Sequence, residues 1–174
     1  LWTWQPPRKP DMHYSPAGVW PVESHGTVYI CDPERAMTAL DLATGQQLWR
    51  TYQSKVRESI GLSKDGRRLY AKTMQDSIVC YAARRDRAQQ LWATNAGFGY
   101  EHARVMLAEK DGVCFCSTKN GLIIAIEGKT GRLLWIHKVG NTLINTIIPV
   151  SARELYFTNE DGLVGRLEVD SRVR

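Results

Sequence analysis

Short apolar runs, each followed by turn residues, recur along the whole chain. The clearest runs are rich in β-branched and aromatic side chains and fall at 27–30, 68–71, 113–116 and 155–158. Turn signals such as Asp65-Gly66, Asp111-Gly112 and Asn120-Gly121 lie beside them. Asp-Gly and Asn-Gly favour the positive φ angles of tight hairpins. Strand-like runs about 8 to 12 residues apart, with turn signals between them, predict an all-β protein.

A Leu-Trp pair repeats at a fixed spacing. Trp49, Trp92 and Trp135 each follow a leucine and lie 43 residues apart. A fourth pair, Leu1-Trp2, precedes Trp49 by 47 residues. A period of roughly 40 to 50 residues is typical of a four-stranded propeller blade.

The residues before these tryptophans repeat as well. Residues 39–49 and 125–135 both fit Ala-x-Asp/Glu-x-x-Thr-Gly-x-x-x-Trp. The middle copy is degraded: Ala82 and Trp92 keep the spacing, but Arg84, Arg87 and Ala88 replace the acid, the threonine and the glycine. The pattern resembles the quinoprotein-type β-propeller family, which is built from pyrroloquinoline-quinone-like (PQQ-like) repeats.

The resemblance implies an all-β fold, a β-propeller or partial propeller of about four blades, each with four antiparallel strands. It also implies that the tryptophans are docking residues, which stack between neighbouring blades against the alanine and glycine of the next blade. The residues to which the resemblance gives this structural docking role are Trp2, Trp49, Trp92, Trp135, Ala39, Gly45, Ala125 and Gly131.

The whole chain, 1–174, is interpreted as one propeller module. Three complete blades are expected at about 16–50, 56–93 and 102–136, and an incomplete last blade at 143–169. Residues 1–4 supply an outer strand with nothing before it. Three arrangements remain open: a tight four-blade ring, a homodimer that completes an eight-blade ring, or a piece of a longer propeller. The chain does not begin with Met, so a mature fragment or an excised piece is expected.

The first strand of each predicted blade begins with polar residues, which would surround one mouth of the central channel. These candidate binding residues are His13, Tyr14, Arg57, Glu58, Glu101, His102, Arg104 and Asn145. They form either a small binding funnel or peptide-docking face, or simply a solvated rim. In the second case Glu58 and Arg104 are an ion pair between neighbouring blades.

Charge and cysteine usage narrow the function classes. The net charge is +5, with its densest part at Arg84, Arg85 and Arg87, but no aromatic residues interleave to stack bases, so no nucleic acid is expected as a partner. Cys31, Cys80, Cys114 and Cys116 lie in apolar runs without the Cys-x-x-Cys spacing of a zinc site. They are interpreted as buried free thiols, which favour a reducing compartment. No window approaches the roughly 18 apolar residues of a membrane helix.

No catalytic residue, cofactor or metal ligand is assigned. The dehydrogenases that this family includes have an adjacent Cys-Cys pair, which this chain lacks. The first hypothesis is a non-catalytic scaffold that binds a protein or peptide partner, located in the bacterial periplasm or cell envelope; the thiols leave a cytoplasmic location as the alternative. The second hypothesis is an accessory domain of a larger enzyme, such as a metallophosphoesterase or a serine/threonine kinase. The third is a fragment of a quinone-dependent dehydrogenase.

Overall fold

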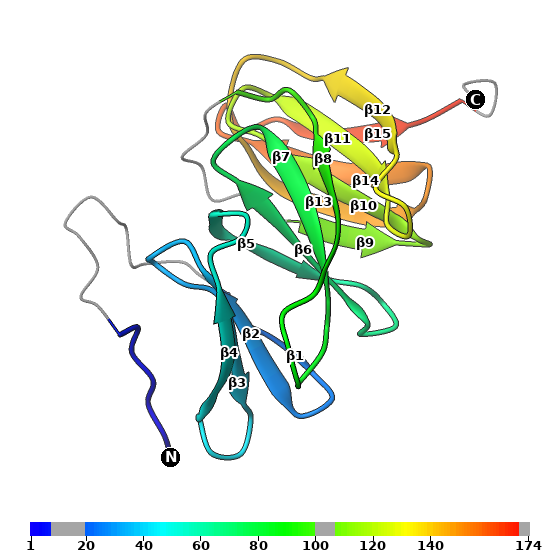
Figure 1. Cartoon of the computed structure of the whole chain (residues 1–174). Coiled ribbons are helices and arrows are strands. Elements are labelled where there is room, and N and C mark those ends of the chain that lie inside the picture. The colour runs from blue at the N-terminus through cyan, green and yellow to red at the C-terminus, as the bar shows by residue number, and fades with distance from the viewer. Residues whose placement is uncertain (8–19, 100–106, 171–174) are drawn as a thin grey trace.

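Four antiparallel sheets follow one another along the chain (Figure 1). The computed structural model describes residues 1–7, 20–99 and 107–170, and within these ranges every regular element is a strand. The first sheet holds β1 (Val22–Ser24), β2 (Thr27–Cys31), β3 (Met37–Asp41) and β4 (Gln47–Thr51). The second holds β5 (Val56–Leu62), β6 (Arg68–Thr73), β7 (Ser77–Ala82) and β8 (Gln90–Asn95). The third holds β9 (Leu107–Lys110), β10 (Val113–Ser117), β11 (Leu122–Glu127) and β12 (Leu133–Lys138). The fourth holds β13 (Ile144–Ser151), β14 (Glu154–Asn159) and β15 (Val164–Glu168).

Each sheet is a meander in which sequential strands pair antiparallel. The sheets touch through their first strands: β5 contacts β1, β2 and β9, and β13 contacts β9 and β10. The first strands therefore lie toward the centre, while β4, β8 and β12 lie at the outer edges. This radial order is that of a partial β-propeller and confirms the all-β fold expected from the repeats.

Local turn chemistry sets the first hairpin of the first and third repeats. His25 and Gly26 have φ of 50° and 75°, and Asp111 and Gly112 have φ of 49° and 79°. Two successive positive φ angles match the right-handed twist of the flanking strands, which is why such turns occur in two-residue hairpins. The positive φ angles expected for such turns are confirmed at Asp111-Gly112, whereas at Asp65-Gly66 and Asn120-Gly121 only the glycine has one.

The hydrophobic core is divided among the junctions between sheets. One cluster joins the first and second sheets and includes Tyr29, Trp49 and Tyr81. Another joins the second and third around Tyr70 and Cys114. A last one joins the third and fourth. Each sheet thus buries apolar side chains against its neighbour, as layered folds require.

Burial along the strands follows from this layering. All five residues of β10 are buried because the third sheet has a neighbour on both faces. By contrast, β15 alternates between exposed and half-buried residues. A strand covered on one face alone shows this period of two. The outer face of the fourth sheet is therefore open among the residues that the structure describes.

The ends of the chain differ from the sequence-based expectation. Residues 1–6 form no strand, although an outer strand was predicted at 1–4. A strand needs a neighbour whose backbone groups it can pair with, and β15 pairs with β14 alone among the described strands. In Figure 1 Leu1 and β15 lie at opposite ends of the molecule, so the N-terminal segment does not complete the fourth sheet of its own chain.

Candidate functional site

The eight residues expected at a channel mouth are only partly placed by the structure. Arg57 lies half-buried in β5, and Asn145 lies exposed in β13. Both strands are first strands of their sheets. Glu58 lies in β5, but its side chain is outside what the structure describes. The remaining five fall outside the described residues; they are His13, Tyr14, Glu101, His102 and Arg104. The binding funnel therefore stays a prediction.

The junctions between sheets are described in more detail. The Nε1 atom of Trp92 donates a hydrogen bond of 3.0 Å to the carbonyl oxygen of Gly128. A Cβ placed on Gly131 would lie 2.6 Å from Cδ2 of the same indole, and Cε3 and Cγ would be nearly as close. Since Gly131 also has a φ of 78°, this turn requires glycine for both its backbone and the ring above it.

Trp2 lies on the first sheet in the same manner. Its Nε1 atom donates a hydrogen bond of 2.9 Å to the carbonyl oxygen of Leu42. A Cβ on Gly45 would collide with the same three ring atoms, Cδ2, Cε3 and Cγ. Leu42 and Gly45 hold the same places in their turn as Gly128 and Gly131 hold in the third sheet. Trp2 therefore lies where the outer-strand tryptophan of a preceding sheet would lie.

The second sheet receives Trp49 through a different turn. The Nε1 atom of Trp49 donates a hydrogen bond of 2.8 Å to the carbonyl oxygen of Arg84. The turn spans residues 83–89, whereas the corresponding turns span 42–46 and 128–132. These two extra residues change the alignment of the repeat. Cys80 pairs with Trp92 across the strands, as Ala39 pairs with Trp49, so Ala82 does not hold the alanine position that spacing assigned to it.

An aromatic side chain on the second strand of each complete sheet packs against the tryptophan of its outer strand. The ring centroids of Tyr29 and Trp49 are 5.9 Å apart. Those of Tyr70 and Trp92 are 6.0 Å apart, and those of Phe115 and Trp135 are 5.9 Å apart. The tilted arrangement and the separation are within the range that aromatic pairs favour. The same geometry thus recurs in three sheets.

Polar side chains also join the first two sheets. The guanidinium of Arg85 forms an ion pair with Asp41, which in turn accepts hydrogen bonds from the backbone and hydroxyl of Thr44. The hydrogen bonds from Arg85 and Thr44 lower the pKa of Asp41 to about 2. The hydroxyl of Ser24 donates a 2.7 Å hydrogen bond to the carbonyl oxygen of Gly66. These contacts hold the rim of the junction between the first and second sheets.

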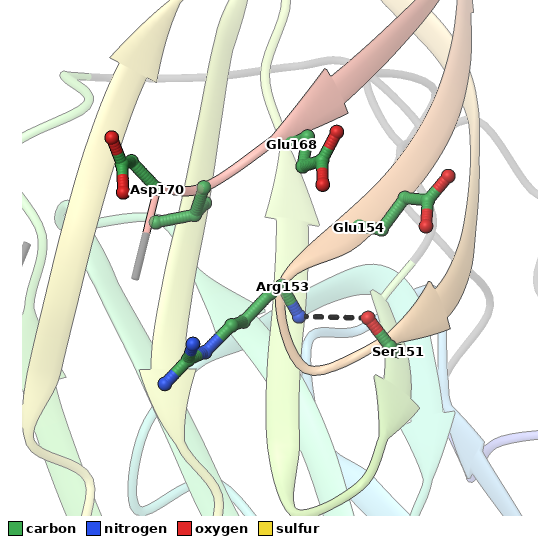
Figure 2. Close-up of a pocket in the computed structure, with 6 residues that line it drawn as sticks. Ser151, Arg153, Glu154, Glu168 and Asp170 are labelled. Atoms are coloured by element: carbon green, nitrogen blue, oxygen red, sulfur yellow. Dashed lines mark hydrogen bonds between the residues drawn. The ribbon is translucent and has the colours of Figure 1, made fainter. Parts of the chain in front are cut away.

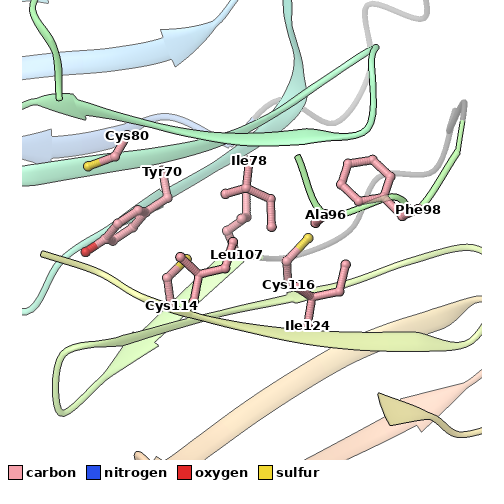
Figure 3. Packing of buried hydrophobic residues seen from close by; sticks show 10 residues of the cluster. Tyr70, Ile78, Cys80, Ala96, Phe98, Leu107, Cys114, Cys116 and Ile124 are labelled. Carbon is pink, nitrogen blue, oxygen red and sulfur yellow. The ribbon is translucent and has the colours of Figure 1, made fainter. Parts of the chain in front are cut away.

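The four cysteines belong to the cores. Cys80, Cys114 and Cys116 lie between the second and third sheets with Tyr70 and Ile124 (Figure 3). Cys31 lies in the preceding core. All four are free thiols. Burial raises the pKa of Cys80 to about 12, and it also raises the pKa of Cys31 and of Cys114. The interpretation as buried free thiols is confirmed.

A shallow hollow lies at the far end of the fourth sheet (Figure 2). Ser151, Arg153, Glu154, Glu168, Val169 and Asp170 line it. Glu154 and Glu168 both pair with Arg166, at 2.6 and 3.0 Å. The hollow is polar and open, and its carboxylates already have a cationic partner. Within the described ranges, no group of three or more His, Cys, Asp or Glu side chains could hold a metal ion.

Comparison with known proteins identifies the repeat. A family model for PQQ-type repeats, described as outer membrane protein assembly factor BamB, matches residues 1–97 and 37–174, which together cover the chain. The chain belongs to the PQQ-like repeat family. The family resemblance inferred from the repeated Leu-Trp motif is therefore confirmed. No curated protein matches the chain individually.

Solved structures share the fold of this PQQ-like chain. The computationally designed Ika8 and Ika4 proteins each align with a TM-score of 0.70 and 16% identity. The alignment covers 86% of this chain and 45% of Ika8, and 91% of this chain and 95% of Ika4. Sqt1 of Saccharomyces cerevisiae aligns with a TM-score of 0.64 and 16% identity over 84% of this chain and 41% of its own. The chain thus spans less than half of Ika8 and Sqt1 and nearly all of Ika4.

Sequence reasoning missed the polar contacts between the PQQ-like repeats. Asp41 and Arg85 are 44 residues apart, and the degraded copy of the motif gave no signal that Arg85 forms an ion pair with the previous sheet. The aromatic partners of the tryptophans could have been found, because Tyr29, Tyr70 and Phe115 occupy the same place in each strand run.

The described residues include no helix that could cross a membrane.

Proposed function

We propose that this PQQ-like chain is a non-catalytic propeller module that binds a protein partner in the bacterial cell envelope and acts in the assembly of outer-membrane proteins. The observation that carries the proposal is the match of the whole chain to a model described as an outer membrane protein assembly factor. A second copy of the chain, completing an eight-blade ring, is one of the partners proposed.

The placement of the polar groups supports a binding role. Asp41 shapes a turn and pairs with Arg85, and Ser24 joins two sheets. Asp32 accepts hydrogen bonds from Thr38 and from Arg50, which also pairs with Glu34. The thiols have high pKa values inside the cores. These groups maintain the architecture, and none of them is an activated nucleophile or a poised acid–base pair.

The outer strands offer surfaces for such a partner. The strands β4, β8 and β12 are the last strands of their sheets, so each has backbone groups on one side that no strand of the same sheet covers. Leu91 on β8 and Leu133 and Ile136 on β12 are exposed apolar residues. An edge strand with apolar side chains can accept an extended segment of another protein by strand addition.

The test is depletion of the protein in its source cells. We expect the fraction of folded outer-membrane β-barrel proteins, measured by their heat-modifiable mobility on gels, to fall and to recover when the wild-type chain is supplied again. The same cell fractions would show the chain with the envelope. An unchanged folded fraction after complete depletion would overturn the role in assembly.

A second candidate is the accessory domain of a larger protein, because the same arrangement of sheets occupies only 45% and 41% of two longer chains. An immunoblot of source cells with an antibody against this module separates the two. A band near 19.7 kDa supports a self-contained module. A much larger band would move the search for activity to the rest of the polypeptide.

A dehydrogenase fragment is tested with pyrroloquinoline quinone and Ca²⁺. The proposed binding module gives no change in the quinone spectrum and no dye reduction with alcohols or sugars. Saturable binding accompanied by dye reduction would contradict the non-catalytic proposal.

A further inference from the structure

Tyr156 lacks the tryptophan that its counterparts have. In the first sheet Tyr29 pairs with Ala39, which pairs with Trp49, and in the third sheet Phe115, Ala125 and Trp135 form the same row. In the fourth sheet Tyr156 pairs with Arg166, and among the described residues no strand follows β15 there. Tyr156 is accordingly 41% exposed, whereas Tyr29 is 1% exposed. The row that buries an aromatic ring elsewhere is incomplete at this position.

Trp2, in contrast, docks on a sheet although it belongs to no strand. It contacts the first sheet through Leu42 and Gly45 with the same indole atoms that Trp92 uses on Gly131. Trp92, however, also belongs to β8 and packs against Tyr70 of its own sheet. Trp2 belongs to no strand. The chain thus contains a docked tryptophan without a sheet and a sheet without a tryptophan.

The two terminal faces match this arrangement. On the outer face of the fourth sheet Ile148 and Val164 are 58% and 72% exposed beside Tyr156. On the first sheet Val28 and Ile30 are half-buried, whereas Leu69 and Ala71, their counterparts in the second sheet, are buried against a preceding sheet. Each face has the apolar composition of a junction, and no sheet formed by the described ranges of the chain covers it.

We propose that residues Leu1 to Trp4 of one copy of this chain form the fourth strand of the fourth sheet of a second copy. Trp2 keeps its contacts with Leu42 and Gly45 of its own chain and packs against Tyr156 of the second copy. Two such joints, related by a two-fold axis, close four sheets from each chain into a ring of eight. Self-complementary contacts of this kind are what a two-fold dimer requires.

The second copy is chosen as the occupant because residues Leu1 to Trp4 do not reach β15 of their own chain as it is folded. Leu1 and β15 lie at opposite ends of the molecule (Figure 1). In the Ika8 chain the same arrangement of sheets takes up 45% of the length. A polypeptide about twice as long as this chain therefore holds this arrangement together with further residues. A dimer would offer the same extent of fold from two polypeptides.

The register of the joint follows from the complete sheets. Trp49 pairs with Ala39 and Thr51 pairs with Met37, and the residues of β15 in those two places are Arg166 and Val164. The strand of the second copy would therefore set Trp2 opposite Arg166 and Trp4 opposite Val164. Arg166, which Glu154 and Glu168 hold on this face, can place its guanidinium over the Trp2 indole, a favourable cation–π contact.

Sedimentation equilibrium of the full chain tests the dimer, and a disulfide tests the register. We expect twice the 19.7 kDa mass of the chain. The variant with Trp4→Cys and Val164→Cys should form, on mild oxidation, a species of twice the chain mass that reductant reverses. The matched control, Leu91→Cys with Val164→Cys, pairs two exposed positions outside the register and should form none.

A point substitution tests the joint without new thiols. Tyr156→Arg should weaken the dimer about 30-fold or more, the effect of removing an interface hot spot, while the far-ultraviolet spectrum stays the same. Tyr52→Arg, the same substitution at a 48% exposed position outside the joint, should leave the dimer intact.

Three results would overturn the joint: a monomeric mass at all concentrations, a disulfide formed within one chain, or equal weakening by both arginine variants. The inference rests on the proposed role as a binding module, but the two fail separately. A monomeric chain that still restores outer-membrane protein folding would remove the dimer and leave the function in place.

Discussion

The indole of Trp92 lies on Gly131 of the next sheet, close enough that a single added carbon would meet the ring at 2.6 Å. The contact joins a side chain on β8 to the turn between β11 and β12, and a hydrogen bond from Trp92 Nε1 to Gly128 fixes the ring. Trp2 repeats the contact on Gly45. A repeat protein is stabilised largely by contacts between adjacent units, so these junctions carry much of the stability of the fold.

Replacing Trp49 with alanine is expected to lower the free energy of unfolding by roughly 3–5 kcal/mol, as truncating a large core aromatic does. Trp49 is 9% exposed and packs on Tyr29. Trp20→Ala is the matched control, because Trp20 is 77% exposed, and it should change stability by less than about 0.5 kcal/mol. Equilibrium urea unfolding measures both. A loss below about 1 kcal/mol for Trp49→Ala would mean that it does not hold the sheets together.

Alanine at Gly131 should destabilise the protein more than alanine at Gly112. Both glycines lie in the third sheet with φ of 78° and 79°, so the strain of placing alanine in the left-handed region, about 1–2 kcal/mol, is common to both. Only Gly131 also faces an indole, whereas nothing lies within 4 Å of a Cβ on Gly112. The excess, on the order of 1–3 kcal/mol for overpacking, reports the docking contact. Equal losses in urea unfolding would show that the turn yields to the added methyl group.

Acid should weaken the junction between the first and second sheets through Asp41. Its pKa in the folded protein is about 2, below the ordinary 3.8, because Arg85 and Thr44 bind the carboxylate. A lowered pKa gives stability that is fully present above about pH 4 and is lost as the pH falls toward 2. The coupling between Asp41→Asn and Arg85→Gln, measured as a double-mutant cycle from urea unfolding, should be favourable at pH 6 and much weaker near pH 2. A coupling that is the same at both pH values would contradict the ion pair.

The four native thiols should not react with a thiol reagent at pH 8 until the protein unfolds. Burial raises the pKa of Cys80 to about 12 and raises those of Cys31 and Cys114, and the thiolate is the reactive form. All four should react at once in denaturant. Leu91→Cys, at a 43% exposed position outside the proposed joint, provides the control by adding one fast thiol. A fast native thiol in the unmodified chain would show that a junction between sheets opens readily.

The sequence carried most of the local information. Hairpin turns such as Asp111-Gly112 and the strands beside them depend on residues that are neighbours in the chain, so their type and place could be derived from turn chemistry and alternation. The Leu-Trp period gave the number of repeats, because each sheet uses nearly the same number of residues. The position assigned to Ala82 was wrong because the turn before Trp92 is two residues longer than in the other repeats. The longer turn shifts the strand pairing, and spacing alone does not show where extra residues are inserted.

By itself the sequence thus determined that the protein is all-β, that it is assembled from four repeats, and that its tryptophans recur with glycines spaced to receive them. Only the tertiary structure decided which tryptophan meets which turn, that Asp41 pairs with Arg85, and that Tyr156 and Val164 lie on an open face. The physical reason is that strand patterns depend on neighbouring residues, whereas contacts between sheets depend on the angle at which whole sheets pack, which no short stretch of sequence encodes.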